Sequence, residues 1–243
     1  MTNPTAAMLV IGDEILSGRT RDSNMHYLAG ELAQRGIDLM EVRFVADVQD
    51  RIVTALNDLR AGFDHVFTSG GIGPTHDDIT ADAVAHAFNV GISIRSDARA
   101  ILEAHYQRTG LELNAARLRM ARIPDGAALI DNPVSSAPGF SIGNVHVMAG
   151  VPAVFQAMVA SVLPQITGGQ PLLSQSLTLM RGEGEIAEVL GALAASQPSL
   201  SIGSYPFQRN GAYGTQIVVR GHDGAEVDAA ILYLSRAYPQ VAE

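Results

Sequence analysis

A string of glycines joins an apolar strand to a helix in the first third of the chain. The apolar run 63–68 leads into Ser69-Gly70-Gly71-Ile72-Gly73-Pro74-Thr75-His76-Asp77-Asp78-Ile79-Thr80, and a helical pattern follows. A strand that ends in glycines and restarts as a helix presents bare backbone N–H groups and the positive end of a helix dipole. The string therefore requires a strand, loop and helix unit, and the loop suits a phosphate or a carboxylate.

Two adjacent carboxylates, Asp77 and Asp78, change what this loop is expected to bind. They would repel an anion unless a cation lay between them, and Mg²⁺ binds carboxylates and phosphate oxygens together. The string therefore favours a metal-assisted phosphate or diphosphate site. A structural interpretation stays open, because Thr75 and Asp78 have capping-box spacing and Asp77 has the chemistry of an N-cap.

Composition excludes several other classes of protein. The chain has 243 residues, enough for one large or two smaller domains with a core. A net charge of −9 with no basic run gives no electrostatic footprint for nucleic acid, and the lack of cysteine excludes disulfides, thiol catalysis and Cys-ligated zinc. With no basic N-terminal region and no apolar stretch near the ~18 residues of a membrane span, we expect a cytoplasmic protein and no membrane partner.

Strand-like apolar runs alternate with helical patterns over residues 1–167. Such alternation predicts right-handed crossovers and an α/β fold with a doubly wound, mainly parallel sheet. The expected strands are 6–11, 39–45, 63–68, 127–130, 140–142 and 145–148, and the expected helices are 23–35, 49–60, 78–88, 97–107, 112–122 and 152–163.

A turn-rich stretch at 166–171 indicates a linker to a second domain, 172–243. Its expected order is strand 174–180, helix 184–195, strands 199–205 and 214–220 joined by a turn at Asn210-Gly211, and helix 225–238. That order predicts a small α+β domain with two layers.

Glycines and polar side chains recur where the strands of the first domain end. The ligand crevice of an open α/β sheet lies outside the carboxyl ends of its strands, so these residues are expected to converge. Each also has a structural interpretation as a turn or helix-cap residue. The candidates are Gly12, Asp13, Glu14, Ser17, Gly18 and Asn24 after the first strand, Asp47 after the second, Ser135, Ser136, Pro138 and Gly139 in a later loop, and Gly150 and Pro152 before a helix.

Together these motifs resemble the N-terminal region of the CinA family, which contains the molybdopterin-binding domain also found in MoaB and Mog proteins. The resemblance rests on the segments 12–18, 22–24, 70–80, 132–139 and 150–152 with Asp47, and more loosely on 202–206. It implies a MoaB/Mog-like fold and a homo-oligomer, either a dimer or a trimer, and we expect the dimer for a chain of two domains. Longer family members carry a nicotinamide-nucleotide deamidase domain, which we do not expect here.

The resemblance implies a ligand that binds through phosphate and an activity on a diphosphate bond. CinA-type relatives are linked to divalent-metal-dependent hydrolysis of ADP-ribose, and similar domains of eukaryotic FAD synthases to FAD hydrolysis. Mog-type relatives adenylylate molybdopterin. We expect a Mg²⁺-dependent nucleotide-diphosphate hydrolase; molybdopterin binding or adenylylation and a non-catalytic nucleotide-binding module are the alternatives.

The resemblance also implies residue roles. Asp47 and Asp78 match the two acidic residues assigned to chemistry in the Mog branch, and Asp77 matches the extra acidic residue of the CinA branch. We expect these three to be catalytic and to hold Mg²⁺ or another divalent cation. The backbone N–H groups of Gly70, Gly71 and Gly73, with Thr75, are expected to contact phosphate.

The chain departs from the family pattern in three places. Ser135-Ser136 replaces the usual Gly-Thr, Ala149 replaces a proline, and Val154 replaces a glutamate. If that glutamate aids metal binding or catalysis, the activity here is weakened, altered or lost.

Overall fold

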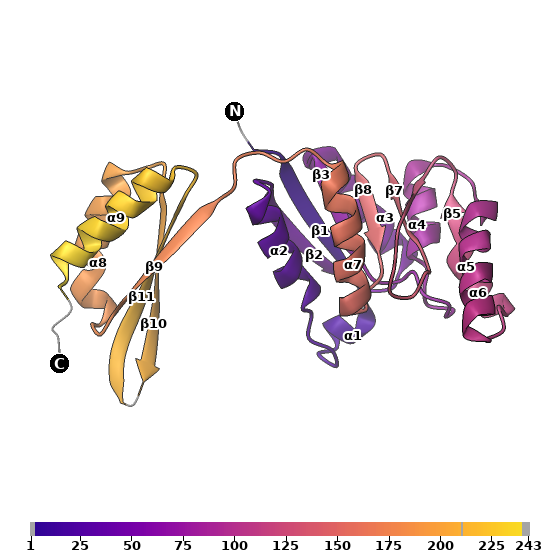
Figure 1. Cartoon of the computed structure of the whole chain (residues 1–243), viewed down its shortest axis with the longest axis horizontal. Helices are drawn as coiled ribbons and strands as arrows, with labels where there is room; N and C mark the ends of the chain where they lie inside the picture. The colour runs from indigo at the N-terminus through magenta and orange to yellow at the C-terminus, as the bar shows by residue number, and fades with distance from the viewer. Residues whose placement is uncertain (1–2, 210, 240–243) are drawn as a thin grey trace. The chain divides into compact units, whose positions relative to one another are not determined.

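The chain divides into two compact units, Met1–Gly169 and Gln170–Glu243 (Figure 1). The structure is a computed structural model, and it describes residues 3–209 and 211–239. The division falls inside the stretch 166–171. Asn210, expected in the last turn between strands, lies outside the described residues.

A six-stranded sheet forms the centre of the first unit. Its spatial order is β2 (Asp38–Val45), β1 (Thr5–Ile11), β3 (His65–Ser69), β8 (Val145–Met148), β7 (Gly139–Ile142) and β6 (Ala128–Ile130). The first four strands run parallel, whereas β7 pairs antiparallel with both β8 and β6. The mainly parallel α/β fold expected from the sequence is confirmed.

Helices cover both faces of this sheet (Figure 1). Alternate residues of β1 point to opposite faces, and all those from Ala6 to Ile11 are at most 3% exposed. Ala7, Leu9 and Ile11 pack with α3 (Gln49–Gly62) and α4 (Thr80–Phe88), and Ala6, Met8 and Val10 pack with α2 (Asn24–Gln34) and α7 (Pro152–Val162). Burial on both faces explains why β1 is continuously apolar rather than alternating.

The helix expected over 112–122 is wrong in its extent. Residues 115–118 form a single turn, α6 (Ala115–Leu118), followed by the 3-10 turn η1 (Arg119–Ala121) and strand β5 (Arg122–Pro124). The Asn114 side chain accepts a hydrogen bond from the N–H of Arg117 and starts the short helix. Pro124 disfavours a helical conformation at Ile123, and β5 pairs instead with β4 (Ile92–Ile94), which the sequence did not reveal.

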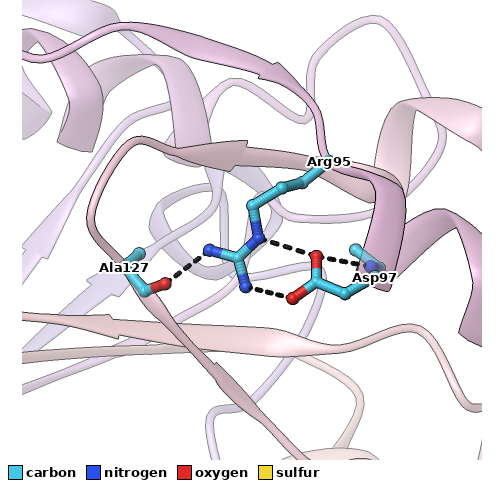
Figure 2. A network of polar contacts seen from close by, with 4 residues as sticks. Arg95, Asp97 and Ala127 are labelled. Carbon is cyan, nitrogen blue, oxygen red and sulfur yellow. Dashed lines mark hydrogen bonds and ion pairs between the residues drawn. The ribbon is translucent and has the colours of Figure 1, made fainter.

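Arg95 anchors this segment to the sheet (Figure 2). Its guanidinium donates to both carboxylate oxygens of Asp97, at 2.7 and 2.8 Å, and to the carbonyl oxygen of Ala127. Its backbone N–H donates to the carbonyl of Ala121 at 2.9 Å. The start of α5 (Ser96–Thr109), the end of η1 and the entrance to β6 are thus joined by one residue.

The second unit is a three-stranded antiparallel sheet with two helices. Leu179, Ile186, Ile217, Val219 and Leu234 are among its core residues. The order along the chain is β9 (Leu173–Leu179), α8 (Glu183–Ser196), β10 (Ser201–Arg209), β11 (Ala212–Gly221) and α9 (Gly224–Ala237), and the spatial order is β10-β11-β9. This confirms the expected small α+β domain. No helix in the described part of either unit combines the length and apolarity needed to cross a membrane.

A buried histidine, His146, and its partly buried neighbour His65 make the stability of the first unit depend on pH. His146 in β8 lies 2.9 Å from the Ser141 hydroxyl through Nδ1 and 3.4 Å from His65 Nδ1 through Nε2. Burial lowers the pKa of His146 to about 4 and also lowers the pKa of His65. The unfolded chain therefore binds protons between pH 6.5 and about 4 that the folded chain does not, so the free energy of unfolding falls as the pH falls through this range.

We expect His146 to account for a loss of roughly 3 kcal/mol between pH 7 and pH 4. Urea unfolding of the parent, His146→Asn and His26→Asn, which alters an exposed histidine, measures this dependence. The profile of His146→Asn is expected to be flatter than the other two. Parallel profiles for all three proteins would contradict the assignment.

Candidate functional site

The glycine loop after β3 has a backbone conformation that only glycine adopts easily. Gly70 and Gly71 have φ values of +107° and +69°. A Cβ on Gly70 would lie 2.2 Å from the carbonyl oxygen of Ile11, and a Cβ on Gly71 would lie 2.1 Å from the Thr80 hydroxyl. Thr80 holds the turn, because its N–H donates to Gly71 O at 2.9 Å and its hydroxyl to Gly70 O at 3.0 Å. The packing of the loop alone therefore requires glycine at both positions, whether or not a ligand binds there.

Asp78 is oriented by the same loop. Its Oδ2 accepts hydrogen bonds from the N–H and the hydroxyl of Thr75, at 2.8 and 2.5 Å. The sequence predicted a helix from Asp78, but α4 begins only at Thr80, so Asp78 lies just before the helix. A Cβ on Gly73 would lie 2.6 Å from Oδ2, so the absence of a side chain there leaves room for this carboxylate. The capping-type interpretation of Thr75 and Asp78 thus describes a real local contact.

Asp47 is the centre of a group of carboxylates at the carboxyl edge of the sheet. Its Oδ2 accepts the N–H of Asp13 at 2.9 Å, which fixes the single turn α1 (Asp13–Leu16) beside β2. Burial raises the pKa of Asp47, the hydrogen bond from Asp13 lowers it, and the negative charges of Asp13, Glu14 and Asp77 raise it. We call these four side chains the carboxylate cluster. Val48, not Asp47, is the N-cap of α3, so a capping role does not explain Asp47.

Asp77 is an exposed member of this cluster, as is Asp13. The nearby Thr75 hydroxyl lowers the pKa of Asp77, and His76 Nδ1 lies 3.8 Å from Asp77 Oδ1. Both side chains face solvent, 99% exposed for His76 and 64% for Asp77. Neither is held in one orientation by packing, so both are open to a ligand or an ion.

The expected metal ligands do not form a complete cage. Within residues 3–209 and 211–239, no group of three or more His, Asp or Glu side chains lies close enough to hold a metal ion. Mg²⁺ is usually bound by one or two carboxylates, several waters and substrate phosphates, so hard oxygen donors such as Asp47 and Asp78 fit that ion. A Mg²⁺ site built from Asp47, Asp77 and Asp78 stays a prediction.

A first hollow beside the loop, the Arg119 hollow, brings together residues from four segments. Gly71, Gly73, Asp78 and Pro138, all expected from the sequence, line it with Arg119 and Arg122. Arg122 donates to both oxygens of Asp82, at 2.7 and 2.6 Å, so its charge is matched. Neither arginine was among the site residues expected from the sequence, because the segment 112–122 was expected to be a helix. The only available signal was two cations in an acidic chain.

A second hollow, the Asn24 hollow, lies beside the ends of β1 and β3. Glu14, Asn24, Gly150 and Pro152 line it, as does Arg21, which was not among the residues expected from the sequence. Asn24 is 4% exposed, and its Nδ2 donates to the Ser69 hydroxyl and to Gly150 O, both at 2.8 Å. Its Oδ1 is buried without a hydrogen-bond partner among the described residues, so it is an acceptor ready for a ligand donor or a water.

The loop with Ser135 and Ser136 is closed on itself. Asn132 Oδ1 accepts the N–H of Ser135 at 3.2 Å, Asn132 Nδ2 donates to the Ser135 hydroxyl at 2.6 Å, and Asn132 O accepts the N–H of Ser136. These N–H groups are therefore not directed at a ligand. The hydroxyl of Ser136 remains a candidate contact.

The other expected residues have structural roles. Gly12 donates its N–H to Val45 O at 3.1 Å, Ser17 ends α1, and Gly18 has a φ of +72°. A Cβ on Gly139 would lie 2.4 Å from Val147 O. Val154, which replaces the glutamate of the family, lies in α7 and is 7% exposed. It packs in the core with residues of β1 and α2, and its apolar side chain provides no ligand atom.

Each of the two units matches a known protein family. Residues 7–168 match the family described as probable molybdopterin binding domain. The chain belongs to this family. A crystal structure of CinA from Thermoplasma acidophilum is similar at a TM-score of 0.62 and 32% identity, over 67% of this chain and 99% of that one. The MoaB/Mog-like fold and the CinA resemblance are thereby confirmed.

The second unit has a relative of a different kind. Residues 171–242 match the middle domain of FAD synthase, a relationship that the looser CinA resemblance of this region did not name. A CinA-like protein of Citrifermentans bemidjiense is 38% identical over 201 residues, 79% of this chain and 49% of its own length. A probable FAD synthase of Caenorhabditis elegans is 30% identical over 256 residues, 95% of this chain and 49% of its own length. The chain spans about half the length of these two relatives.

Proposed function

We propose that this protein hydrolyses the diphosphate bond of a nucleotide such as ADP-ribose or FAD with the help of a divalent cation. The observation that carries the proposal is the carboxylate cluster around the half-buried Asp47, at the same sheet edge as the glycine loop. A concentration of negative charge next to an anion-binding turn suits a ligand that brings both phosphate and a cation.

The residues of the chain have distinct parts in this proposal. Asp47 and Asp78 would hold the cation, and the backbone N–H groups of the loop from Gly71 to Gly73 would orient the phosphates. When bound, Mg²⁺ would neutralise charge on the diphosphate and activate the attacking water. Asp77 lies at the exposed side, where it would complete the ion site as the ligand arrives.

The family matches indicate a function connected with a nucleotide or a molybdopterin-type cofactor. Within that class they support a second candidate, binding or adenylylation of molybdopterin, because the first unit matches a probable molybdopterin binding domain. The buried Val154 in place of the family glutamate favours a third, a nucleotide-binding module without turnover. The homo-oligomer stays a prediction, which light scattering tests.

Incubation of the purified protein with ADP-ribose, with FAD, and with ATP plus molybdopterin, each with and without Mg²⁺, separates the candidates. We expect AMP release from a dinucleotide only when Mg²⁺ is present. Adenylylated pterin would support the second candidate instead. Binding of ADP-ribose without any product would reject hydrolysis and support the third.

A further inference from the structure

Arg119 presents an incompletely satisfied cation to the glycine loop. Its Nε is buried and has no hydrogen-bond partner among the described residues. One guanidinium nitrogen, Nη2, donates to the carbonyl oxygen of Asp78 at 3.4 Å, which is a long contact. A buried donor without an acceptor is unfavourable, so an additional acceptor at this position would stabilise the side chain.

Two nearby arginines, Arg95 and Arg122, have matched charges, and Arg119 does not. Arg122 forms a two-point ion pair with Asp82, and Arg95 forms one with Asp97. In the part of the chain that the structure describes, no carboxylate forms an ion pair with Arg119, although the chain has 25 acidic residues and only 16 Lys and Arg. In an acidic protein, a cation without a carboxylate partner is available for an external anion.

The residues that line the Arg119 hollow favour an anion as the ligand group. Gly71 and Gly73 expose backbone on one side, and the Asp78 carboxylate beside them is turned to Thr75. The Asp82 carboxylate is occupied by Arg122. The guanidinium is a planar fork of donors that matches the oxygens of a phosphate.

The segment that carries Arg119 is held two and three residues further along the chain, at Ala121 and Arg122. The N–H of Arg95 binds Ala121 O, the Arg95 side chain binds Asp97 and Ala127 (Figure 2), and the ion pair of Arg122 ties β5 to α4. Arg119 therefore approaches the loop from a fixed backbone. Little conformational freedom of that backbone is lost when a ligand binds.

We propose that Arg119 binds a phosphate group of the ligand, so that the anion lies between its guanidinium and the backbone of Gly71 to Gly73. This inference rests on the proposed function for the identity of the ligand. It does not depend on hydrolysis, because a phosphate that is bound and not cleaved would make the same contacts.

Calorimetric titration of Arg119→Met with ADP-ribose and with inorganic pyrophosphate, both with Mg²⁺, tests the proposal. Methionine keeps an unbranched apolar stem and removes the charge and the donors. We expect the dissociation constant for each probe to rise about tenfold to a hundredfold. Arg117→Met is the matched control, because Arg117 lies two residues before Arg119, does not line the Arg119 hollow, and contacts Glu112 O and the Tyr106 ring instead. Both substitutions change the net charge equally.

Arg119→Lys keeps the charge and loses the fork, so its affinity is expected to lie between the parent and Arg119→Met. Circular dichroism shows which variants fold. If Arg119→Met does not fold, the affinity of Arg119→Lys tests the proposal. Parent-like affinity in the folded Arg119 variants, equal losses in Arg117→Met, or a parent that binds neither probe would overturn the proposal. A parent that binds pyrophosphate through Arg119 but releases no AMP from ADP-ribose would reject hydrolysis and support Arg119.

Discussion

Asp47→Asn is expected to reduce Mg²⁺-dependent AMP release from ADP-ribose by a factor of about 100 to 1,000, the scale of losing one main electrostatic contact in an active site. Asparagine keeps an oxygen that accepts the N–H of Asp13, so α1 stays in place and only the charge is lost. Steady-state kinetics at saturating Mg²⁺ measure the change. Asp50→Asn, three residues further along at the exposed start of α3, is the matched control for net charge.

The same substitution should not destabilise the fold. Because burial and the charges of Asp13, Glu14 and Asp77 raise the pKa of Asp47, its ionised form is less favourable in the folded chain than in the unfolded one. Removing the charge at neutral pH is therefore expected to leave the melting midpoint without Mg²⁺ unchanged or higher. Equal turnover in Asp47→Asn and Asp50→Asn would exclude Asp47 from the reaction.

Gly71→Val is expected to weaken ADP-ribose binding by a factor of at least about 100 and to lower the free energy of unfolding by about 3 kcal/mol or more. Valine is strained at a φ of +69°, and its Cβ would lie 2.1 Å from the Thr80 hydroxyl. Both effects displace the loop. Calorimetric titration measures the affinity, and urea unfolding measures the stability.

A milder pair of variants separates ligand binding from packing. Thr80→Ala removes the atom that a Cβ at position 71 would meet first, and Gly71→Ala/Thr80→Ala then adds that Cβ with less obstruction. We expect the double variant to bind ADP-ribose at least about tenfold more weakly than Thr80→Ala, because alanine also disfavours a positive φ. Equal affinities in two folded variants would show that the loop is a structural turn and that the site lies elsewhere.

Local pattern predicted the elements that are both long and strongly apolar. The strand from Ala6 to Ile11 and the longer helices of both units follow from runs that are buried on one or both sides. The glycine loop followed equally well, because Gly70 and Gly71 have backbone angles that the residue type itself signals. Short elements were missed where hydrogen bonds to distant strands decide the conformation, as at β4 and β5.

The candidate site was predicted in part for the same reason. Sheet topology made the ends of β1, β2 and β3 converge, so Asp13, Glu14 and Asp47 could be assigned to one edge from chain order alone. The Ser135 loop has a backbone that turns inward onto Asn132, which no spacing rule reveals. Arg119 lies 41 positions from Asp78, and only folding brings them into contact.

The sequence by itself determined that this chain has an α/β unit of the molybdopterin-binding family, a smaller α+β unit, and a glycine loop flanked by carboxylates. These features depend on residue types and spacings over a few turns of chain, where local sterics and apolar periodicity act. Only the tertiary structure decided which side chains have partners. The Asp47 carboxylate accepts the N–H of Asp13, and Asp82 pairs with Arg122. Arg119 Nε and Asn24 Oδ1 have no hydrogen-bond partner among the described residues. Burial and hydrogen-bond satisfaction are properties of packed surroundings, so they appear only when distant segments are in contact.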